Sequence, residues 1–263
     1  MPQFQFEHPC FQPPEVREAS LSAAALRAPV GPRLVGGTSF DSKPDLEPWQ
    51  IQALAQACLE SLDAARQVIF GWQRQGHTLT FIYTRGITPC ARLLGDWWGS
   101  DRLDFALITI ASTHLQRLLH EFSAEFLREA PSEPQGLSLL LLTEPGAQHS
   151  MGLFMLGEFF RRAGWTVTLG VPPDVSEFKR LFRTEWFDAV GVSISTDRHL
   201  STLEKLLPQL KATSVNLDMH IFVGGPMVLA APERLNWRCA EVLTGDAPDT
   251  VRQVTDSMAS RVV

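Results

Sequence analysis

The sequence lacks the long apolar runs that would place the chain in a membrane. No stretch approaches the roughly 18 to 20 apolar residues that span a bilayer. The N-terminus, MPQFQFEHPC, has neither the basic start nor the following apolar segment of a secretion signal. We therefore expect a soluble, cytoplasmic protein that does not contact a membrane.

Positive charge is also scarce. The chain of 263 residues carries a formal net charge of −6 and contains no cluster of lysine and arginine. Proteins that hold nucleic acid neutralise its phosphates with such clusters. Direct nucleic-acid binding is therefore not expected, and no helix-turn-helix pattern is found at either end of the sequence.

Cysteine is rare and widely spaced. The four cysteines are Cys10, Cys58, Cys90 and Cys239. None of them forms the Cys-x-x-Cys spacing of a zinc site or a redox pair. Free thiols in a reducing compartment are the expected state.

Hydrophobic residues make up 44% of the chain, enough for a substantial core, but they avoid its beginning. Eight of the eighteen prolines fall in the first 48 residues, where no apolar period is sustained. Such a composition cannot bury enough apolar surface to order itself. We expect residues 1–44 to form a Pro-rich, flexible N-terminal arm.

Helical periodicity dominates residues 45–130. Apolar spacing predicts one long helix from Pro48 to Gly76, a second over 87–98 and a third over 103–128. The segment EAPSEPQG (129–136) then supplies Pro, Ser and Gly without an apolar anchor, as linkers do. Residues 45–130 are therefore predicted to form a helical bundle, called here the cap.

From residue 137 the pattern changes to short apolar runs that alternate with amphipathic helices. The runs cover 137–143, 165–171, 187–194, 219–225 and 240–244. This alternation is typical of a parallel sheet covered on both faces. We predict an α/β fold in which residues 137–263 form a Rossmann-like, doubly wound domain of five parallel strands with flavodoxin-like topology.

Polar residues and glycines gather where the strands of this sheet should end. In open parallel sheets, ligands bind at the carboxyl ends of the strands. Each signal has an ordinary structural explanation by itself: a lone histidine often ends a helix, Ser-x-Ser often caps one, and Gly-Gly-Pro often makes a turn. The residues in these loops are Glu144, His149, Ser150, Gly152, Ser193, Ser195, Gly224, Gly225 and Gly245.

Taken together, these loops resemble a known cofactor domain. His-x-x-Gly in the first loop, Ser-x-Ser after the third strand and Gly-Gly after the fourth are similar to the motif DxHxxG…SxL…GG of the cobalamin-binding domain of methionine synthase and its relatives. The resemblance covers residues 45–263. It implies that His149 ligates cobalt, with imidazole nitrogen as a suitable ligand, and that the serines and glycines line the slot for the nucleotide tail of the cofactor.

The cap carries a second part of the resemblance. In the same family a helical bundle covers the upper face of the corrin ring with a tryptophan. By spacing, Trp98 is the counterpart in this chain, and Trp97 is its neighbour. The alternative is that both indoles only anchor the core of the cap.

The pattern departs from the family at two places. Ala147 stands where the family has the aspartate that orients the histidine, so ligation should be weaker or altered; Glu144 is a nearby candidate substitute. Ile108 and Thr109 stand where light-sensing repressors of this superfamily have a Glu-His pair. Their adenosyl-directed photochemistry is therefore not encoded in the same way.

The chain most resembles the AerR/PpaA group of antirepressors from purple photosynthetic bacteria. That resemblance implies a light-responsive regulator that binds hydroxocobalamin or adenosylcobalamin and contacts a DNA-binding repressor of photosystem genes. We do not expect an enzyme, because Asp101, Asp104 and Glu121 look like solvated charges on helices rather than catalytic groups. His8 is a second candidate cobalt ligand, although it is more easily explained as an unbound histidine of the arm.

Two other functions stay open from the sequence. A related module in blue-light regulators holds haem, and His149 can ligate iron as well as cobalt. A corrinoid carrier for methyl transfer is the other alternative, and it would need a methyltransferase partner. The Gly-Gly slot favours cobalamin over haem, because haem has no nucleotide tail.

Overall fold

The computed structural model describes residues 45–147, 150–235 and 237–260. These residues belong to one unit of the chain, Thr38–Val263. The arm over residues 1–44 lies outside the described residues, so its flexibility stays a prediction.

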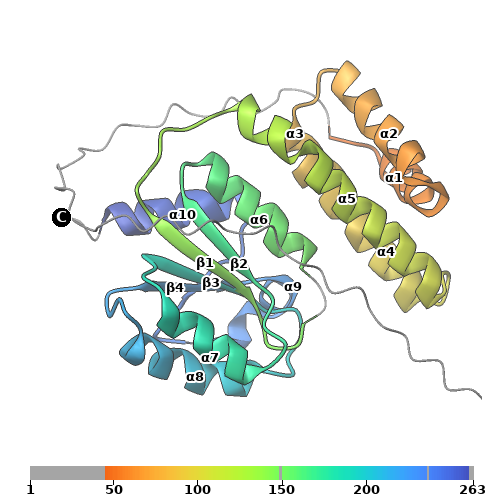
Figure 1. The fold of residues 1–263 in the computed structure, drawn as a ribbon. Coiled ribbons are helices and arrows are strands. Elements are labelled where there is room, and N and C mark those ends of the chain that lie inside the picture. The colour runs from red at the N-terminus through yellow and green to blue at the C-terminus, as the bar shows by residue number, and fades with distance from the viewer. Residues whose placement is uncertain (1–44, 148–149, 236, 261–263) are drawn as a thin grey trace, which may run out of the picture. The chain divides into compact units, whose positions relative to one another are not determined.

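The cap is built of helices, and the part that follows it alternates strands with helices (Figure 1). The cap contains α1 (Pro48–Glu60), α2 (Leu62–Arg74), α3 (Leu79–Phe81), the π-helix η1 (Ile82–Ile87), α4 (Thr88–Gly99) and α5 (Phe105–Glu129). The α/β part contains β1 (Ser138–Thr143), α6 (Met151–Arg162), β2 (Thr166–Gly170), α7 (Val175–Thr184), β3 (Ala189–Ser193), α8 (Leu200–Thr213), β4 (His220–Gly224), α9 (Pro226–Ala230), the 3₁₀ turn η2 (Pro232–Arg234), β5 (Glu241–Val242) and α10 (Ala247–Ala259). Within the described ranges, no helix is both long and apolar enough to cross a bilayer.

The five strands form one parallel sheet in the order β2-β1-β3-β4-β5. Leu140 and Leu142 of β1 pack into the core under α7 and α8, whereas Leu139 and Leu141 pack under α6 and α10. Burial on both faces explains why β1 is a continuous apolar run instead of an alternating one. The predicted five-stranded, doubly wound α/β fold is confirmed.

The first helix of the cap differs from the prediction, because two helices replace the single one expected over 48–76. Ser61 adopts an extended conformation (φ −168°, ψ 161°) between α1 and α2. Its hydroxyl accepts a hydrogen bond from the backbone N–H of Ala64 at 3.0 Å, as an N-cap residue does. The apolar period continues across this break, and for that reason periodicity alone missed it.

The second helix begins earlier than predicted. The helical backbone starts at Leu79, where Thr78 caps it by accepting the N–H of Phe81, and passes through η1 into α4. The π-turn places Gly86 against the indole of Trp72, so close that an added Cβ would lie 2.6 Å from ring carbon Cζ3. A glycine therefore lets α2 and η1 approach one another.

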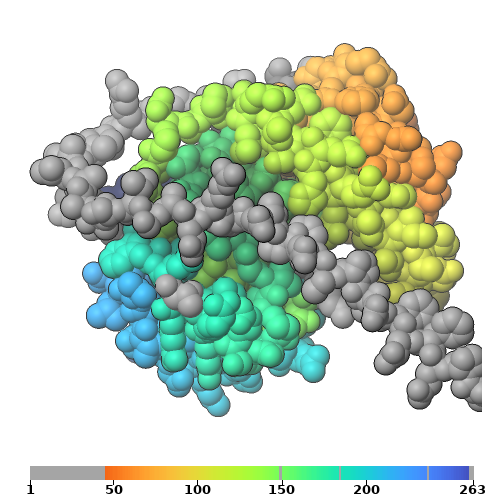
Figure 2. Space-filling model, viewed as in Figure 1, coloured from red at the N-terminus to blue at the C-terminus, as the bar shows by residue number. Residues whose placement is uncertain are grey.

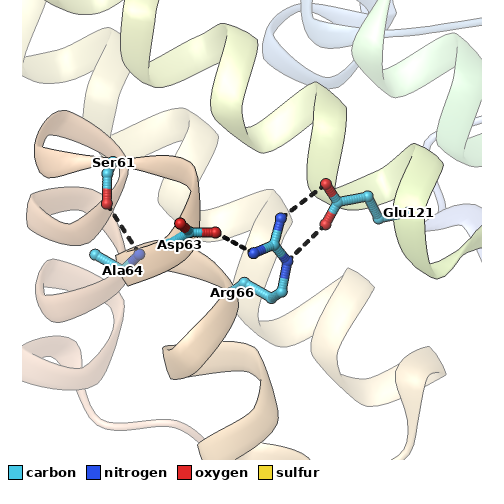
Figure 3. A network of polar contacts seen from close by, with 5 residues as sticks. All are labelled: Ser61, Asp63, Ala64, Arg66 and Glu121. Carbon is cyan, nitrogen blue, oxygen red and sulfur yellow. Dashed lines mark hydrogen bonds and ion pairs between the residues drawn. The ribbon is translucent and has the colours of Figure 1, made fainter.

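Charged side chains join α2 to α5 on the outside of the cap (Figure 3). The guanidinium of Arg66 donates from Nε and Nη2 to the two carboxylate oxygens of Glu121, at 2.9 and 3.0 Å, and it also contacts Asp63. Glu121 is thus an ion-pair partner rather than the simple solvated charge that the sequence suggested, and the bidentate pair lowers its pKa.

Asp104 also has a structural role, because it caps α5 by accepting the N–H of Leu107.

Helix α6 is shared between two cores. Met155 and Phe159 belong to the core of the cap, whereas Leu153 and Phe160 belong to the core under the sheet. At its end, the guanidinium of Arg162 lies 4.0 Å from the ring centroid of Phe126 in α5. The cap therefore packs on the α/β part through α6; whether residues 45–130 and 137–263 are separate domains stays a prediction.

A pair of glycine substitutions in the cap tests the close packing of η1 on the indole of Trp72. Gly95 lies on the exposed face of α4, and no described atom lies within 4 Å of an added Cβ. We expect Gly95→Ala to raise the free energy of unfolding by roughly 0.5–1 kcal/mol, because alanine is the better helix former. Gly86→Ala should lower it by roughly 1–3 kcal/mol, because its Cβ would overlap Trp72.

Urea unfolding followed by far-UV circular dichroism measures both changes. The same stabilisation in both variants would contradict the close packing of η1 on Trp72.

Candidate functional site

The candidate site lies at the carboxyl ends of β1, β3 and β4. The sheet order places β1 beside β3, with β2 outside β1 and β4 outside β3, so the connections diverge at this point. The register pairs Thr143 with Ser193 and Ser193 with Gly224. The loops that carry the predicted residues therefore start side by side at the topological switch point, where open α/β sheets bind ligands.

Glu144 ties the first of these loops to the third strand's loop. Its backbone N–H donates to the carbonyl of Ser193 at 2.9 Å. Its carboxylate oxygen Oε1 accepts from the N–H groups of Ser195 and Thr196, at 3.0 and 2.9 Å, and from the Thr196 hydroxyl at 3.2 Å. The side chain thus anchors the β3 loop, so Oε1 is not free for the role considered above, in which it replaces the aspartate missing at Ala147.

Two buried oxygens at this edge lack hydrogen-bond partners among the described residues. They are Oε2 of Glu144 and the hydroxyl of Thr143, and the two residues are 2% and 1% exposed. Buried polar atoms are nearly always hydrogen-bonded in folded proteins. Polar groups of this kind at a switch point are consistent with a ligand that supplies the missing partners.

The β3 and β4 loops lie against one another through their backbones. Ile194 donates its N–H to Gly224 at 2.8 Å, and its carbonyl accepts from Met227 at 3.1 Å. Gly225 has a φ of 108°, and an added Cβ would lie 2.6 Å from the Ile194 carbonyl and 2.9 Å from the Ser193 hydroxyl. The chain's own backbone therefore requires glycine at 225, whether or not a tail passes beside it.

The remaining predicted glycines differ in their surroundings. A Cβ at Gly224 would make only an ordinary contact, 3.4 Å from the Leu243 carbonyl, whereas one at Gly245 would lie 2.7 Å from Cβ of Asp249 at the start of α10. Gly152, in the first turn of α6, is exposed and has no described atom within 4 Å of that position. Among the predicted glycines, and counting only the residues that the structure describes, Gly152 alone borders open space.

The predicted histidines cannot be placed. His149 and His8 both lie outside the described residues, so their roles as cobalt ligands stay predictions. The residue after His149 in the sequence, Ser150, is half-buried, and its carbonyl accepts the N–H of Phe154 at 2.9 Å as α6 begins.

The two predicted serines of the third loop, Ser193 and Ser195, are half-buried at the end of β3. Within the described ranges, no three His, Cys, Asp or Glu side chains are grouped as metal ligands.

The two neighbouring tryptophans of α4 have opposite environments. Trp97 is 7% exposed and lies in the core of the cap, whereas Trp98 is 52% exposed. Three more exposed apolar side chains follow at the start of α5: Phe105, Leu107 and Ile110. The explanation that both indoles only anchor the core therefore holds for Trp97, and Trp98 is available for a ligand or a partner.

Two surface cavities formed by described residues lie away from these loops. One, of about 270 Å³, opens between α7 and α8 and includes Lys179 and Lys205 in its lining; the other, of about 440 Å³, lies beside Trp237 and Cys239. The outer faces of α7 and α8, in teal and blue, form part of the surface in Figure 2. Neither cavity is lined by a predicted site residue.

Solved structures share this architecture. The Methanosarcina barkeri monomethylamine corrinoid protein superposes with a TM-score of 0.64 at 12% identity, and the match covers 78% of this chain and 96% of that protein. A cobalamin-binding protein from Desulfitobacterium hafniense matches at 19% identity over 78% of this chain and 97% of that one, but its TM-score of 0.40 is too low to support an argument. The chain therefore has a flavodoxin-like five-stranded sheet with a helical cap, a fold that it shares with the monomethylamine corrinoid protein.

Sequence comparison identifies the family. Residues 137–255 match the B12 binding domain. A Rhodobacter capsulatus relative, described as an uncharacterized 20.5 kDa protein in the bchF-crtJ intergenic region, is 31% identical over 163 residues, which are 62% of this chain and 84% of that protein. The chain belongs to the B12-binding domain family, and the cobalamin-type cofactor predicted from the strand-end loops agrees with this.

The described residues fit such a cofactor. Gly152 borders open space, the Trp98 indole is exposed, and the edge of the sheet carries two buried oxygens that lack partners among the described residues. Sequence reasoning did not foresee the hydrogen bonds that Glu144 accepts from the β3 loop, because their partners are 51 and 52 residues apart. The only local signal was a charged residue directly after an apolar strand.

Substitution of the two tryptophans separates their roles. Trp97→Ala should lower the free energy of unfolding by roughly 3–5 kcal/mol, because it empties a core position. Trp98→Ala should change it by less than about 1 kcal/mol. If its indole covers a corrin, Trp98→Ala should also weaken hydroxocobalamin binding by roughly 3- to 10-fold, as loss of an aromatic contact does.

Urea unfolding and a spectroscopic titration with hydroxocobalamin measure the two effects. Equal destabilisation by both substitutions, or unchanged affinity in Trp98→Ala, would contradict this assignment.

Proposed function

We propose that the protein is a cobalamin-binding, light-responsive regulator that acts by contact with a DNA-binding repressor of photosystem genes. The observation that carries the proposal is the 31% identity to the Rhodobacter capsulatus protein encoded between bchF and crtJ, combined with the B12-binding domain. It agrees with the resemblance of the strand-end motifs to the AerR/PpaA antirepressors.

In this proposal His149 would ligate the cobalt, and the Trp98 indole would lie against the corrin. The half-buried Ser150, Ser193 and Ser195 supply hydroxyl groups at the edge of the sheet. When bound, a cobalamin would supply a metal that exchanges a ligand and a metal–alkyl bond that light cleaves. A ligand that binds two arrangements of the cap unequally shifts their populations, and the surface offered to the repressor changes with them.

The packing of α6 favours this coupling. The segment that contains His149 leads directly into α6, and Met155 and Phe159 of that helix lie in the core of the cap. A displacement of the start of α6 would therefore reach α5 through packed side chains rather than through a flexible linker. Differential contacts on the cap side would then alter the surroundings of the exposed side chains Trp98 and Phe105.

A titration of the apo-protein with hydroxocobalamin tests the binding step. We expect the visible spectrum to change on binding, and His149→Ala to lose that change together with at least about tenfold in affinity, since even outer partners of metal ligands contribute roughly 10- to 100-fold. His199→Ala is the matched control, because this half-buried histidine begins α8 at the same edge of the sheet. Identical spectra for wild type and His149→Ala would refute the assignment.

The regulatory step needs a second measurement. A purified repressor of photosystem genes is bound to labelled promoter DNA, and the cobalamin-loaded protein is added in the dark or after illumination. We expect addition of the wild-type protein to change the bound fraction in a light-dependent way, and addition of the His149→Ala protein to leave that fraction unchanged. A repressor–DNA equilibrium that stays constant in every arm would eliminate the regulator proposal.

A corrinoid carrier for methyl transfer is the second candidate, and the fold shared with the monomethylamine corrinoid protein favours it. Methyl transfer from the methylcobalamin-loaded protein to a thiol, faster than from free methylcobalamin, would support the carrier.

Haem is the other alternative cofactor, and titration of the apo-protein with haemin tests it. A Soret band, without any binding of the corrinoid, would replace cobalamin by haem in the proposal.

A further inference from the structure

The carboxylate of Glu144 has one occupied and one unoccupied oxygen in a buried position. The residue is 2% exposed, and Oε1 accepts the three hydrogen bonds from Ser195 and Thr196 described above. Oε2 is buried without a hydrogen-bond partner among the described residues. The structure therefore holds an oriented acceptor at the junction of β1 and β3 whose hydrogen-bonding capacity is half used.

Such an oxygen is costly unless something binds it. A buried polar group without a hydrogen bond destabilises a fold by roughly 1–3 kcal/mol, and a charged group by more. The donors that bond this carboxylate, the N–H groups of Ser195 and Thr196 and the Thr196 hydroxyl, are all directed to Oε1. A hydrogen-bond donor from outside the described residues would complete the site.

A corrinoid carries hydrogen-bond donors on two parts: the amide side chains of its ring, which cobinamide shares, and its nucleotide tail. The resemblance described above implies that the tail lies beside the loops after β3 and β4, and Glu144 holds the first of these loops. The tail contains a phosphate, a ribose with free hydroxyl groups, and a base. A carboxylate accepts hydrogen bonds and repels a phosphate, so it needs an O–H or N–H donor. The ribose hydroxyl is present in every complete corrinoid, whereas an exocyclic amine is present when the base is adenine and absent when it is dimethylbenzimidazole.

We propose that Oε2 of Glu144 accepts a hydrogen bond from a donor on the nucleotide tail, so that this residue makes the site select corrinoids that carry the tail. The inference rests on the proposed cobalamin function, and it concerns a residue outside the motif DxHxxG…SxL…GG. Glu144 then has two roles: Oε1 holds the β3 loop, and Oε2 recognises the ligand that enters beside that loop.

The test substitution is Glu144→Gln. The N–H groups of Ser195 and Thr196 require an acceptor, so the amide oxygen should take the place of Oε1 and the NH₂ group the place of Oε2. The β3 loop stays anchored, but a donor replaces the acceptor at the position of Oε2. Thr196→Val is the matched control, because it removes one hydrogen bond to Oε1 and leaves Oε2 unchanged.

Three probes are titrated into each protein: cobinamide, which lacks the nucleotide tail, hydroxocobalamin, and the adenine-containing cobamide. We expect wild type to prefer the two tail-bearing corrinoids, and Glu144→Gln to lower their affinity by roughly 10- to 100-fold while cobinamide binding stays the same. Thr196→Val should retain the wild-type ratio. A loss confined to the adenine cobamide would identify the base amine as the donor, and a loss for both tail-bearing corrinoids the ribose hydroxyl.

An equal loss for all three probes in Glu144→Gln would overturn the inference and leave Glu144 as a loop anchor only, as would no loss at all. Thermal melting followed by circular dichroism verifies that the variants are folded. If wild type binds none of the probes, the proposed function itself fails, and that result is distinct from a wild type that binds cobalamin without any dependence on Glu144.

Discussion

Burial of α6 on opposite faces is the constraint on which the arrangement of the molecule depends. Leu153 and Phe160 face the sheet, and Met155 and Phe159 face the cap. Residues three, four or seven apart share a face of a helix, and the pairs 153/160 and 155/159 follow this spacing. A helix packed in this way cannot rotate or slide without opening one of two cores. The described chain resumes at Ser150, directly after the predicted cobalt ligand in the sequence, so the start of α6 is linked to both parts of the chain.

The end of α6 is held by charge and aromatic rings. Arg162 donates to the Thr80 hydroxyl at 2.6 Å, lies 3.6 Å from the Glu129 carboxylate and covers the ring of Phe126. Burial lowers the pKa of its guanidinium, and Glu129 opposes that shift. Buried charges of this kind add little net stability compared with apolar residues of similar size, but they penalise any packing in which they lose their partners. The arginine therefore specifies how α6 meets α3 and α5.

The sheet could be predicted from the sequence because parallel strands buried on both faces form unbroken apolar runs, and the loops after them could be located by the switch-point rule. The break at Ser61 was missed because the helical period continues through it, and the π-turn at Gly86 because it depends on the distant indole of Trp72. The same limit applies at the site. Gly225 was interpreted as room for a ligand, but its positive φ and its distance to Ile194 are set by a long-range contact between loops.

These loop contacts determine how a ligand at the switch point would displace the loops after β1, β3 and β4. Glu144 connects the β1 loop to the β3 loop, and the hydrogen bond from Ile194 to Gly224 connects β3 to β4. Groups that are hydrogen-bonded through buried backbone atoms move together, because separating them would leave unsatisfied donors and acceptors. A tail that displaced one loop would therefore displace the others, and it would meet a stiff edge rather than three independent loops. The cap, attached through α6, is the part in which such a displacement can change an exposed surface.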